Sequence, residues 1–186
     1  SDPAQVDNLT YIEEETGETI DIVVMVQGDE PMITPGMITE SLEPFGLPHV
    51  NVVNLMAPIL NDSEFNDPNE VKVVVDKRDQ AMYFSREPIP SKRKGVVDGP
   101  MLKQVCVIPF RRDYLIKFNQ MEETTLERVE SVDMLRVIEN GDVVQMAMTD
   151  EETYSVDTQK ELDAVALKMK GNKFLAAYLP GNQDQP

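Results

Sequence analysis

Short apolar runs alternate along the chain with stretches in which apolar residues recur at helical spacing. The apolar runs predict β-strands at 20–26, 50–56, 71–75, 81–84, 105–108 and 143–148. Helical spacing predicts helices that begin after Thr34, span 112–118 and 124–139, and begin again near Asp157. Because strands alternate with helices, we expect an α/β fold in which a mixed or mostly parallel sheet is layered between flanking helices.

Local signals refine several of these elements. The run from Ile20 to Val26 lacks polar alternation, which is typical of a strand that is buried on both faces. Residues 76–79 separate two strand-like runs and predict a hairpin. Thr124 and Glu127 have the spacing of a capping box, which predicts the start of the 124–139 helix.

The length of 186 residues is that of one domain. We therefore predict a single α/β domain over residues 1–186. Residues 87–100 are rich in Pro, Gly and Lys, which predicts a mobile surface loop. Residues 171–186 show no clear pattern and are interpreted as a C-terminal tail.

The chain is strongly acidic, with 17 Lys and Arg residues against 34 Asp and Glu and a formal net charge of −17. This charge opposes nonspecific binding to nucleic acid and to an anionic membrane, so neither is an expected partner. The single cysteine, Cys106, cannot form a disulfide within one chain, and we interpret it as a core residue of a cytoplasmic protein. No apolar run approaches the roughly 18 residues of a membrane span, and no signal peptide is recognisable.

An acidic turn, Gln27-Gly28-Asp29-Glu30-Pro31, follows the first predicted strand. Ligands of open α/β sheets bind at the carboxyl ends of strands, which is where this turn falls. A carboxylate such as Asp29 in that position is suited to Mg²⁺ that bridges substrate phosphates. A solvated acidic loop is the alternative interpretation.

Five further residues carry candidate chemistry, each with a structural alternative. Lys72 lies inside an apolar run, so its ammonium must reach an edge or meet a partner. Arg86 follows a strand and can bind phosphate or carboxylate through two N–H groups, although exposed arginines are common. Asp157 precedes a helix, where it could instead be an N-cap. Glu127 and Glu130 lie three residues apart on a helix, a spacing that a solvated face also explains.

Five segments, taken in order, resemble the 3-deoxy-manno-octulosonate (Kdo) cytidylyltransferase family. They are Val26-Gln27-Gly28-Asp29-Glu30-Pro31; Asp67-Pro68-Asn69-Glu70-Val71-Lys72-Val73-Val74; Tyr83-Phe84-Ser85-Arg86 with Pro88-Ile89-Pro90; Leu126-Glu127, Glu130 and Leu135-Arg136-Val137; and Val156-Asp157-Thr158 with Glu161-Leu162. The resemblance extends over about 20–165. It implies a nucleotide-diphospho-sugar transferase-like fold that is incomplete at its N-terminus.

The resemblance also implies a function. A family member activates Kdo or a related 3-deoxy-ulosonic acid with CTP, giving CMP-sugar and pyrophosphate for lipopolysaccharide or surface polysaccharide biosynthesis in the cytoplasm, commonly as a homodimer. By this resemblance Mg²⁺ is held by Asp29 and Asp157. Catalytic roles are implied for Asp29, Lys72 and Arg86, and substrate binding for Gln27, Arg86, Gln104, Glu127 and Glu130.

The chain departs from the family pattern in two respects. Residues 1–19 do not match the basic N-terminal loop that cradles the nucleotide triphosphate in the family. Gln104, Ile108 and Met134 stand where the family has His, Tyr and Gln near the sugar acid, so we expect a preference shifted away from Kdo itself. Two alternatives remain: a truncated, noncatalytic homologue that serves as a binding or oligomerisation partner, and a different nucleotidyltransferase of the same fold.

Overall fold

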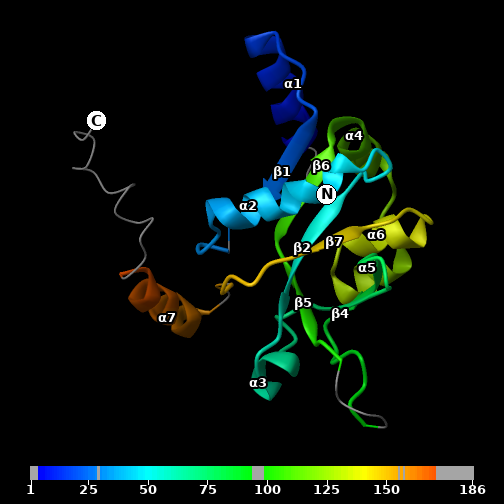
Figure 1. The fold of residues 1–186 in the computed structure, drawn as a ribbon. Helices are drawn as coiled ribbons and strands as arrows, with labels where there is room; N and C mark the ends of the chain where they lie inside the picture. The colour runs from blue at the N-terminus through cyan, green and yellow to red at the C-terminus, as the bar shows by residue number, and fades with distance from the viewer. Residues whose placement is uncertain (1–3, 29, 94–98, 155, 157, 171–186) are drawn as a thin grey trace.

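Seven strands in the described part of the chain form two sheets near the centre of the molecule (Figure 1). The computed structural model describes residues 4–28, 30–93, 99–154, 156 and 158–170. The strands are β1 (Ile22–Val26), β2 (Val53–Pro58), β3 (Lys72–Val75), β4 (Ala81–Ser85), β5 (Leu102–Val105), β6 (Val107–Arg111) and β7 (Gln145–Met148). β1 pairs with β6, and the larger sheet has the order β4-β3-β5-β2-β7.

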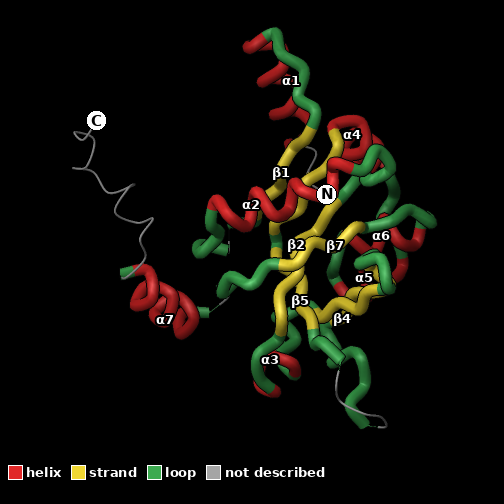
Figure 2. The backbone as a smooth tube through the Cα atoms, viewed as in Figure 1, coloured by secondary structure: helices red, strands yellow, loops and turns green. Residues whose placement is uncertain are grey.

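Helices cover both faces of the strands, which confirms the layered α/β class (Figure 2). They are α1 (Ala4–Thr16), α2 (Pro35–Leu42), the 3₁₀ helix η1 (Glu43–Gly46), α3 (Asp62–Phe65), α4 (Arg112–Gln120), α5 (Thr125–Glu130), α6 (Met134–Glu139) and α7 (Gln159–Met169). Alternate residues of a strand face opposite sides of its sheet. In β2, Met56 accordingly packs in one cluster with Met134 of α6, whereas Leu55 packs in another with Met37 of α2.

The larger sheet is mixed, as predicted, but most pairings of the described strands are antiparallel. β2 and β7 run parallel. The pairs β1–β6, β2–β5, β3–β4 and β3–β5 are antiparallel. The expectation of mostly parallel strands was therefore wrong, because strand direction depends on which strands become neighbours, and apolar runs along the chain do not encode that choice.

Two local predictions are confirmed. β3 and β4 form the predicted hairpin, and Asp79 takes a left-handed conformation in its turn, with φ of 57°. Thr34 is the N-cap of α2, where its hydroxyl oxygen accepts the backbone N–H of Met37 at 3.2 Å. The sequence pattern did not predict α1 or α3, which lie in polar segments.

β1 was predicted to be buried on both faces, and this was wrong. Its residues are half-buried and Val26 is exposed. Among the described strands β1 pairs with β6 along one edge, so its β-branched side chains are only partly covered. No helix in the described residues combines the length and apolarity needed to cross a bilayer.

The predicted strand at 105–108 is the junction of two strands that belong to different sheets. β5 pairs with β2 up to Val105, and β6 pairs with β1 from Val107 onwards. Cys106 lies between them, half-buried, and its carbonyl accepts the backbone N–H of Gln27 at 3.2 Å. The interpretation of Cys106 as a core residue was therefore wrong, because the chain changes sheets at this position.

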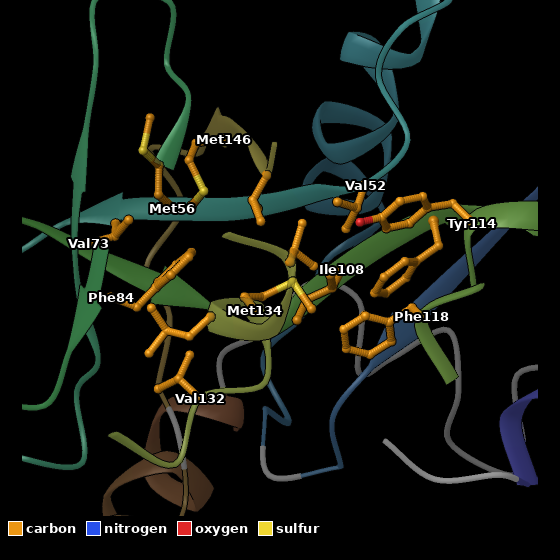
Figure 3. Packing of buried hydrophobic residues seen from close by; sticks show 14 of the residues in the cluster. Val52, Met56, Val73, Phe84, Ile108, Tyr114, Phe118, Val132, Met134 and Met146 are labelled. Atoms are coloured by element: carbon orange, nitrogen blue, oxygen red, sulfur yellow. The ribbon is translucent and has the colours of Figure 1, made fainter. Parts of the chain in front are cut away.

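The predicted helix at 124–139 is interrupted. α5 ends at Glu130, its C-cap Ser131 has a left-handed φ of 54°, and α6 begins only at Met134. At this interruption the side chain of Val132 packs in the largest hydrophobic cluster, beside Met134 and Phe84 (Figure 3). Val129 of α5 is exposed.

Candidate active site

A cavity of about 300 Å³ opens where β5 and β6 diverge between the two sheets. Its walls come from five segments: the end of β1, the turn before β3, the end of β4, the junction of β5 with β6 and the interruption between α5 and α6. The lining residues are Gln27, Glu30, Asn69, Glu70, Val71, Arg86, Gln104, Cys106, Ser131, Val132 and Asp133. Three predicted substrate-binding residues, Gln27, Arg86 and Gln104, thus lie together in one cavity.

Arg86 joins two walls of this cavity. Its Nε donates to the carbonyl of Glu130 at 2.7 Å, one terminal nitrogen donates to the carbonyl of Pro68 at 2.9 Å, and the other to that of Ser131 at 3.2 Å. These contacts use three of the five guanidinium N–H groups. Within the described part of the chain no carboxylate forms an ion pair with Arg86, so its charge and two N–H groups are available to an anionic ligand.

Lys72 is fully buried and does not line the cavity, but it binds the backbone of the same wall. Its ammonium donates to the carbonyls of Asp67 and Glu70, both at 2.7 Å, and to that of Arg86 at 2.6 Å. All three ammonium protons are therefore used. Burial lowers the pKa of Lys72, with nearby carboxylates opposing the shift. The geometry favours a positioning role for Lys72 over the predicted catalytic one.

A second buried lysine holds the turn at 67–70. Lys103 lies opposite Lys72 in the β3–β5 pairing, and its ammonium lies 2.7 Å from Glu64 and 3.1 Å from Glu70. Glu70 also lines the cavity. Burial raises the pKa of the Glu70 carboxyl, and Lys103 offsets part of that rise. One lysine therefore fixes the backbone of this turn, and the other fixes its acidic side chain.

Glu130, predicted to bind substrate, lies behind the cavity wall. Its carboxylate accepts hydrogen bonds from the hydroxyls of Tyr83 and Ser85 and from the backbone N–H of Arg86, at 3.1, 3.0 and 2.8 Å. It is not among the residues that line the cavity. Glu130 thus ties the end of α5 to the end of β4 and orients Arg86.

Glu127 lies in an adjoining hollow that shares Gln27, Ser131, Val132 and Asp133 with the cavity. Its buried carboxylate binds the guanidinium of Arg136 through two hydrogen bonds, one of them 2.8 Å from Arg136 Nε. It also accepts the backbone N–H of Thr124 at 3.1 Å, the glutamate half of the predicted capping box. These bonds join α5 to α6 across the interruption.

Sequence analysis missed Asp133, which borders both the cavity and the adjoining hollow. Burial raises the pKa of its carboxyl. No Gly or Pro signals the helix interruption that brings Asp133 here. By contrast, Ile108 and Met134, which replace polar residues of the resembled family, are both buried in the hydrophobic core and do not line the cavity.

The predicted metal ligands Asp29 and Asp157 lie outside the described residues. Gln27 and Glu30, which flank Gly28-Asp29, both line the cavity. No group of three or more His, Cys, Asp or Glu side chains in the described ranges is arranged to hold a metal ion. Part of the predicted loop at 87–100, residues 94–98, also lies outside the described residues, as does the tail at 171–186.

Similarity to solved structures establishes the class of fold. A glucose-1-phosphate thymidylyltransferase from Bacillus anthracis superposes with a TM-score of 0.57 at 13% identity, over 91% of this chain and 62% of that chain, a likeness of fold alone. A CMP:2-keto-3-deoxy-manno-octonic acid synthetase solved in complex with CTP superposes with a TM-score of 0.78 at 32% identity, over 91% of this chain and 69% of that one. The chain thus has the layered α/β fold of the nucleotidyltransferases.

Sequence comparison then establishes the family. The cytidylyltransferase family model matches residues 7–160, so the chain belongs to the cytidylyltransferase family. The 3-deoxy-manno-octulosonate cytidylyltransferase of Syntrophotalea carbinolica is 38% identical over 81% of this chain, and that of Geobacter metallireducens 39% over 80%. The matched region spans 64% and 63% of the length of these two relatives.

Proposed function

We propose that the protein transfers the cytidylyl group of CTP to Kdo or a closely related 3-deoxy-ulosonic acid. The anomeric hydroxyl oxygen of the sugar acid forms a bond to the α-phosphorus of CTP and loses its proton, while the bond from that phosphorus to the pyrophosphate oxygen breaks. The products are the CMP-sugar and pyrophosphate. Family membership and the names of the relatives support this reaction.

The observation that carries the proposal is the position and charge of the Arg86 guanidinium at the cavity. Its guanidinium is held in place by three backbone carbonyls and has no carboxylate partner among the described residues. Because carbonyls carry no net charge, the positive charge of Arg86 is not neutralised by them. A carboxylate or phosphate group at the cavity can therefore form a charge-assisted pair with it.

The other polar groups of the cavity suit a polyhydroxylated ligand. Gln104, Asn69 and Gln27 offer amide donors and acceptors, and Glu70 and Asp133 offer carboxyl groups. A cavity of about 300 Å³ is at the small end of the usual range of ligand sites and fits a single sugar acid. We assign the carboxylate of the sugar acid to Arg86 and its hydroxyls to the amide and carboxyl groups.

We further propose that Mg²⁺ is held by Asp29 and Asp157. Carboxylate oxygens are the ligands that Mg²⁺ prefers in phosphate-binding sites. Bound Mg²⁺ would offset the charge of the triphosphate and make the attacking hydroxyl more acidic. This requirement is consistent with a chain whose net charge of −17 otherwise repels CTP.

Three cellular expectations belong to the same proposal. The protein acts in the cytoplasm, where CTP is available, and works as a homodimer. Its product serves lipopolysaccharide or surface polysaccharide biosynthesis. Neither nucleic acid nor membrane is a partner, because the net charge opposes both.

Pyrophosphate release tests the proposal. The protein is mixed with Mg²⁺, CTP and a panel of ulosonic and nonulosonic acids, and CTP is replaced in parallel by other nucleoside triphosphates. We expect release with CTP and a 3-deoxy-ulosonic acid, and about 100-fold lower kcat/KM in Arg86→Met. Arg78→Met is the matched control, because Arg78 pairs with Asp76 in the exposed hairpin turn. Binding of CTP or sugar acid without any turnover would favour the noncatalytic alternative.

A further inference from the structure

Asn54 is a fully buried polar residue near the start of β2. It lies on the same face as its neighbours Val52 and Met56, which both belong to the largest hydrophobic cluster. A polar side chain in such surroundings is tolerated only when its hydrogen bonds are made. Its position therefore requires a specific set of partners.

Asn54 occupies the point where the two sheets separate. The pairing of β2 with β5 reaches as far as Leu55 and Val105, and the next contact of this edge is a bridge from Val52 to Phe110 of β6. Between these points the chain passes through Cys106 and leaves one sheet for the other. The Nδ2 of Asn54 donates to the carbonyl of Val105 at 2.8 Å, so it satisfies a backbone acceptor at the end of β5.

The same residue determines how Gln104 is oriented. Nδ2 of Asn54 also donates to the carbonyl of Leu55 at 2.8 Å. Because carbonyl oxygens only accept, this side of the amide must be its nitrogen, and the oxygen must face Gln104. That oxygen likewise only accepts, so Gln104 must present its nitrogen, and Nε2 donates to Asn54 Oδ1 at 2.6 Å. Gln104 lines the cavity, and with Nε2 bound to Asn54 its side-chain acceptor is Oε1.

We infer that Asn54 is a positioning residue, which holds Gln104 so that the cavity presents a fixed carbonyl acceptor to a hydroxyl of the ligand. The inference rests on the proposed function for the identity of the ligand. It assigns complementary roles to two cavity residues: Arg86 donates to the anionic group of the sugar acid, and Gln104 accepts from a hydroxyl. The orientation of the Asn54 amide, and through it that of Gln104, is fixed by the buried carbonyls of Leu55 and Val105.

A double-mutant cycle tests the inference. Affinities for Kdo and for CTP are measured by calorimetry in the unmodified protein, Asn54→Ala, Gln104→Met and the double variant. Each single variant should weaken Kdo binding about tenfold and leave CTP binding within about twofold. The double variant should be no weaker than Gln104→Met, because Asn54 acts through Gln104. Asn119→Ala is the matched control, since it removes an amide-to-carbonyl bond in α4, away from the cavity.

Additive losses, or equal losses for Kdo and CTP, would overturn the inference, because they would indicate general damage to the fold. Nuclear magnetic resonance of the side-chain amides provides a second test. It uses the unmodified protein alone, so it requires no ligand and no folded Asn54 variant. In the unmodified protein one Gln104 amide proton should exchange with solvent more slowly than those of the exposed Gln120. Equal exchange rates would overturn the fixed orientation. Absence of Kdo binding by the unmodified protein would overturn the proposed ligand and the role of Gln104 as acceptor for a ligand hydroxyl. Slow exchange of the amide proton would still establish the Asn54–Gln104 hydrogen bond.

Discussion

The ammonium of Lys72 donates a 2.6 Å hydrogen bond to the backbone carbonyl of Arg86. Through this bond a buried residue of β3 fixes the end of β4, from which the guanidinium of Arg86 reaches the cavity. The same ammonium fixes the turn at 67–70, whose Pro68 carbonyl accepts from Arg86. Lys72 and Arg86 thus form one support for this wall of the cavity.

Replacement of Lys72 tests this support. Lys72→Met keeps most of the side-chain volume but leaves three partly buried carbonyls without their donor, so we expect a loss of about 3 kcal/mol in the free energy of unfolding. Urea denaturation measures this loss. Lys77→Met, in the exposed hairpin turn, is the control and should leave the midpoint unchanged. Unaltered stability of Lys72→Met would contradict the positioning role.

The Glu127–Arg136 pair predicts a specific dependence of stability on acid. Burial alone would raise the pKa of Glu127, but the bonds from Arg136 and the backbone N–H of Thr124 lower it below its ordinary value. Since the folded pKa is depressed, the stabilisation is present above the unfolded pKa near 4.5 and is lost as pH falls through the folded pKa.

We therefore expect Glu127→Gln to lower the free energy of unfolding by about 3 kcal/mol at pH 7, because Arg136 is left buried without its partner. The difference from the unmodified protein should shrink as the pH falls below 4.5. Denaturation curves from about pH 3 to about pH 7, a range that includes the ordinary carboxyl pKa, measure this difference. Glu15→Gln, on the exposed face of α1, is the control. A difference that is constant over this range would contradict the assigned ion pair.

Asp29 tests the proposed metal role. Asp29→Asn keeps the shape of the side chain but removes the charge that Mg²⁺ requires, so Mg²⁺-dependent pyrophosphate release from CTP and Kdo should be abolished. The unfolding midpoint should remain close to that of the unmodified protein. Asp150→Asn, an exposed acid after β7, is the matched control. Undiminished pyrophosphate release in Asp29→Asn would exclude Asp29 as a metal ligand.

The left-handed conformation of Ser131 predicts opposite effects of two substitutions. Ser131→Gly should be neutral or stabilising by up to about 1 kcal/mol, because glycine adopts positive φ without steric cost. Ser131→Val should destabilise by about 1–2 kcal/mol for the converse reason. The valine variant should also raise the KM for the sugar acid, since the Ser131 carbonyl accepts from Arg86. Equal stability of both variants would show that the interruption between α5 and α6 does not depend on this residue.

The sequence by itself determined the elements whose signals are local. The Thr34 cap, the hairpin at 76–79 and the strands around 22–26 and 53–58 follow from capping, turn chemistry and apolar runs, which act over a few residues. The family was recognisable for a related reason, because five short segments keep their order and spacing. Gln27, Arg86 and Gln104 were therefore found before the cavity that brings them together.

Tertiary structure alone decided which candidates face the cavity and which support it. Lys72 and Glu130 are residue types common in binding sites, yet their hydrogen bonds are satisfied by neighbours 2–47 positions away in the chain. The change of sheet at Cys106 and the helix break at Ser131 depend on which strands pair and on the burial of Val132. Both create the cavity, and neither has a local signal, because the free energy that favours them comes from contacts between segments that are distant in sequence.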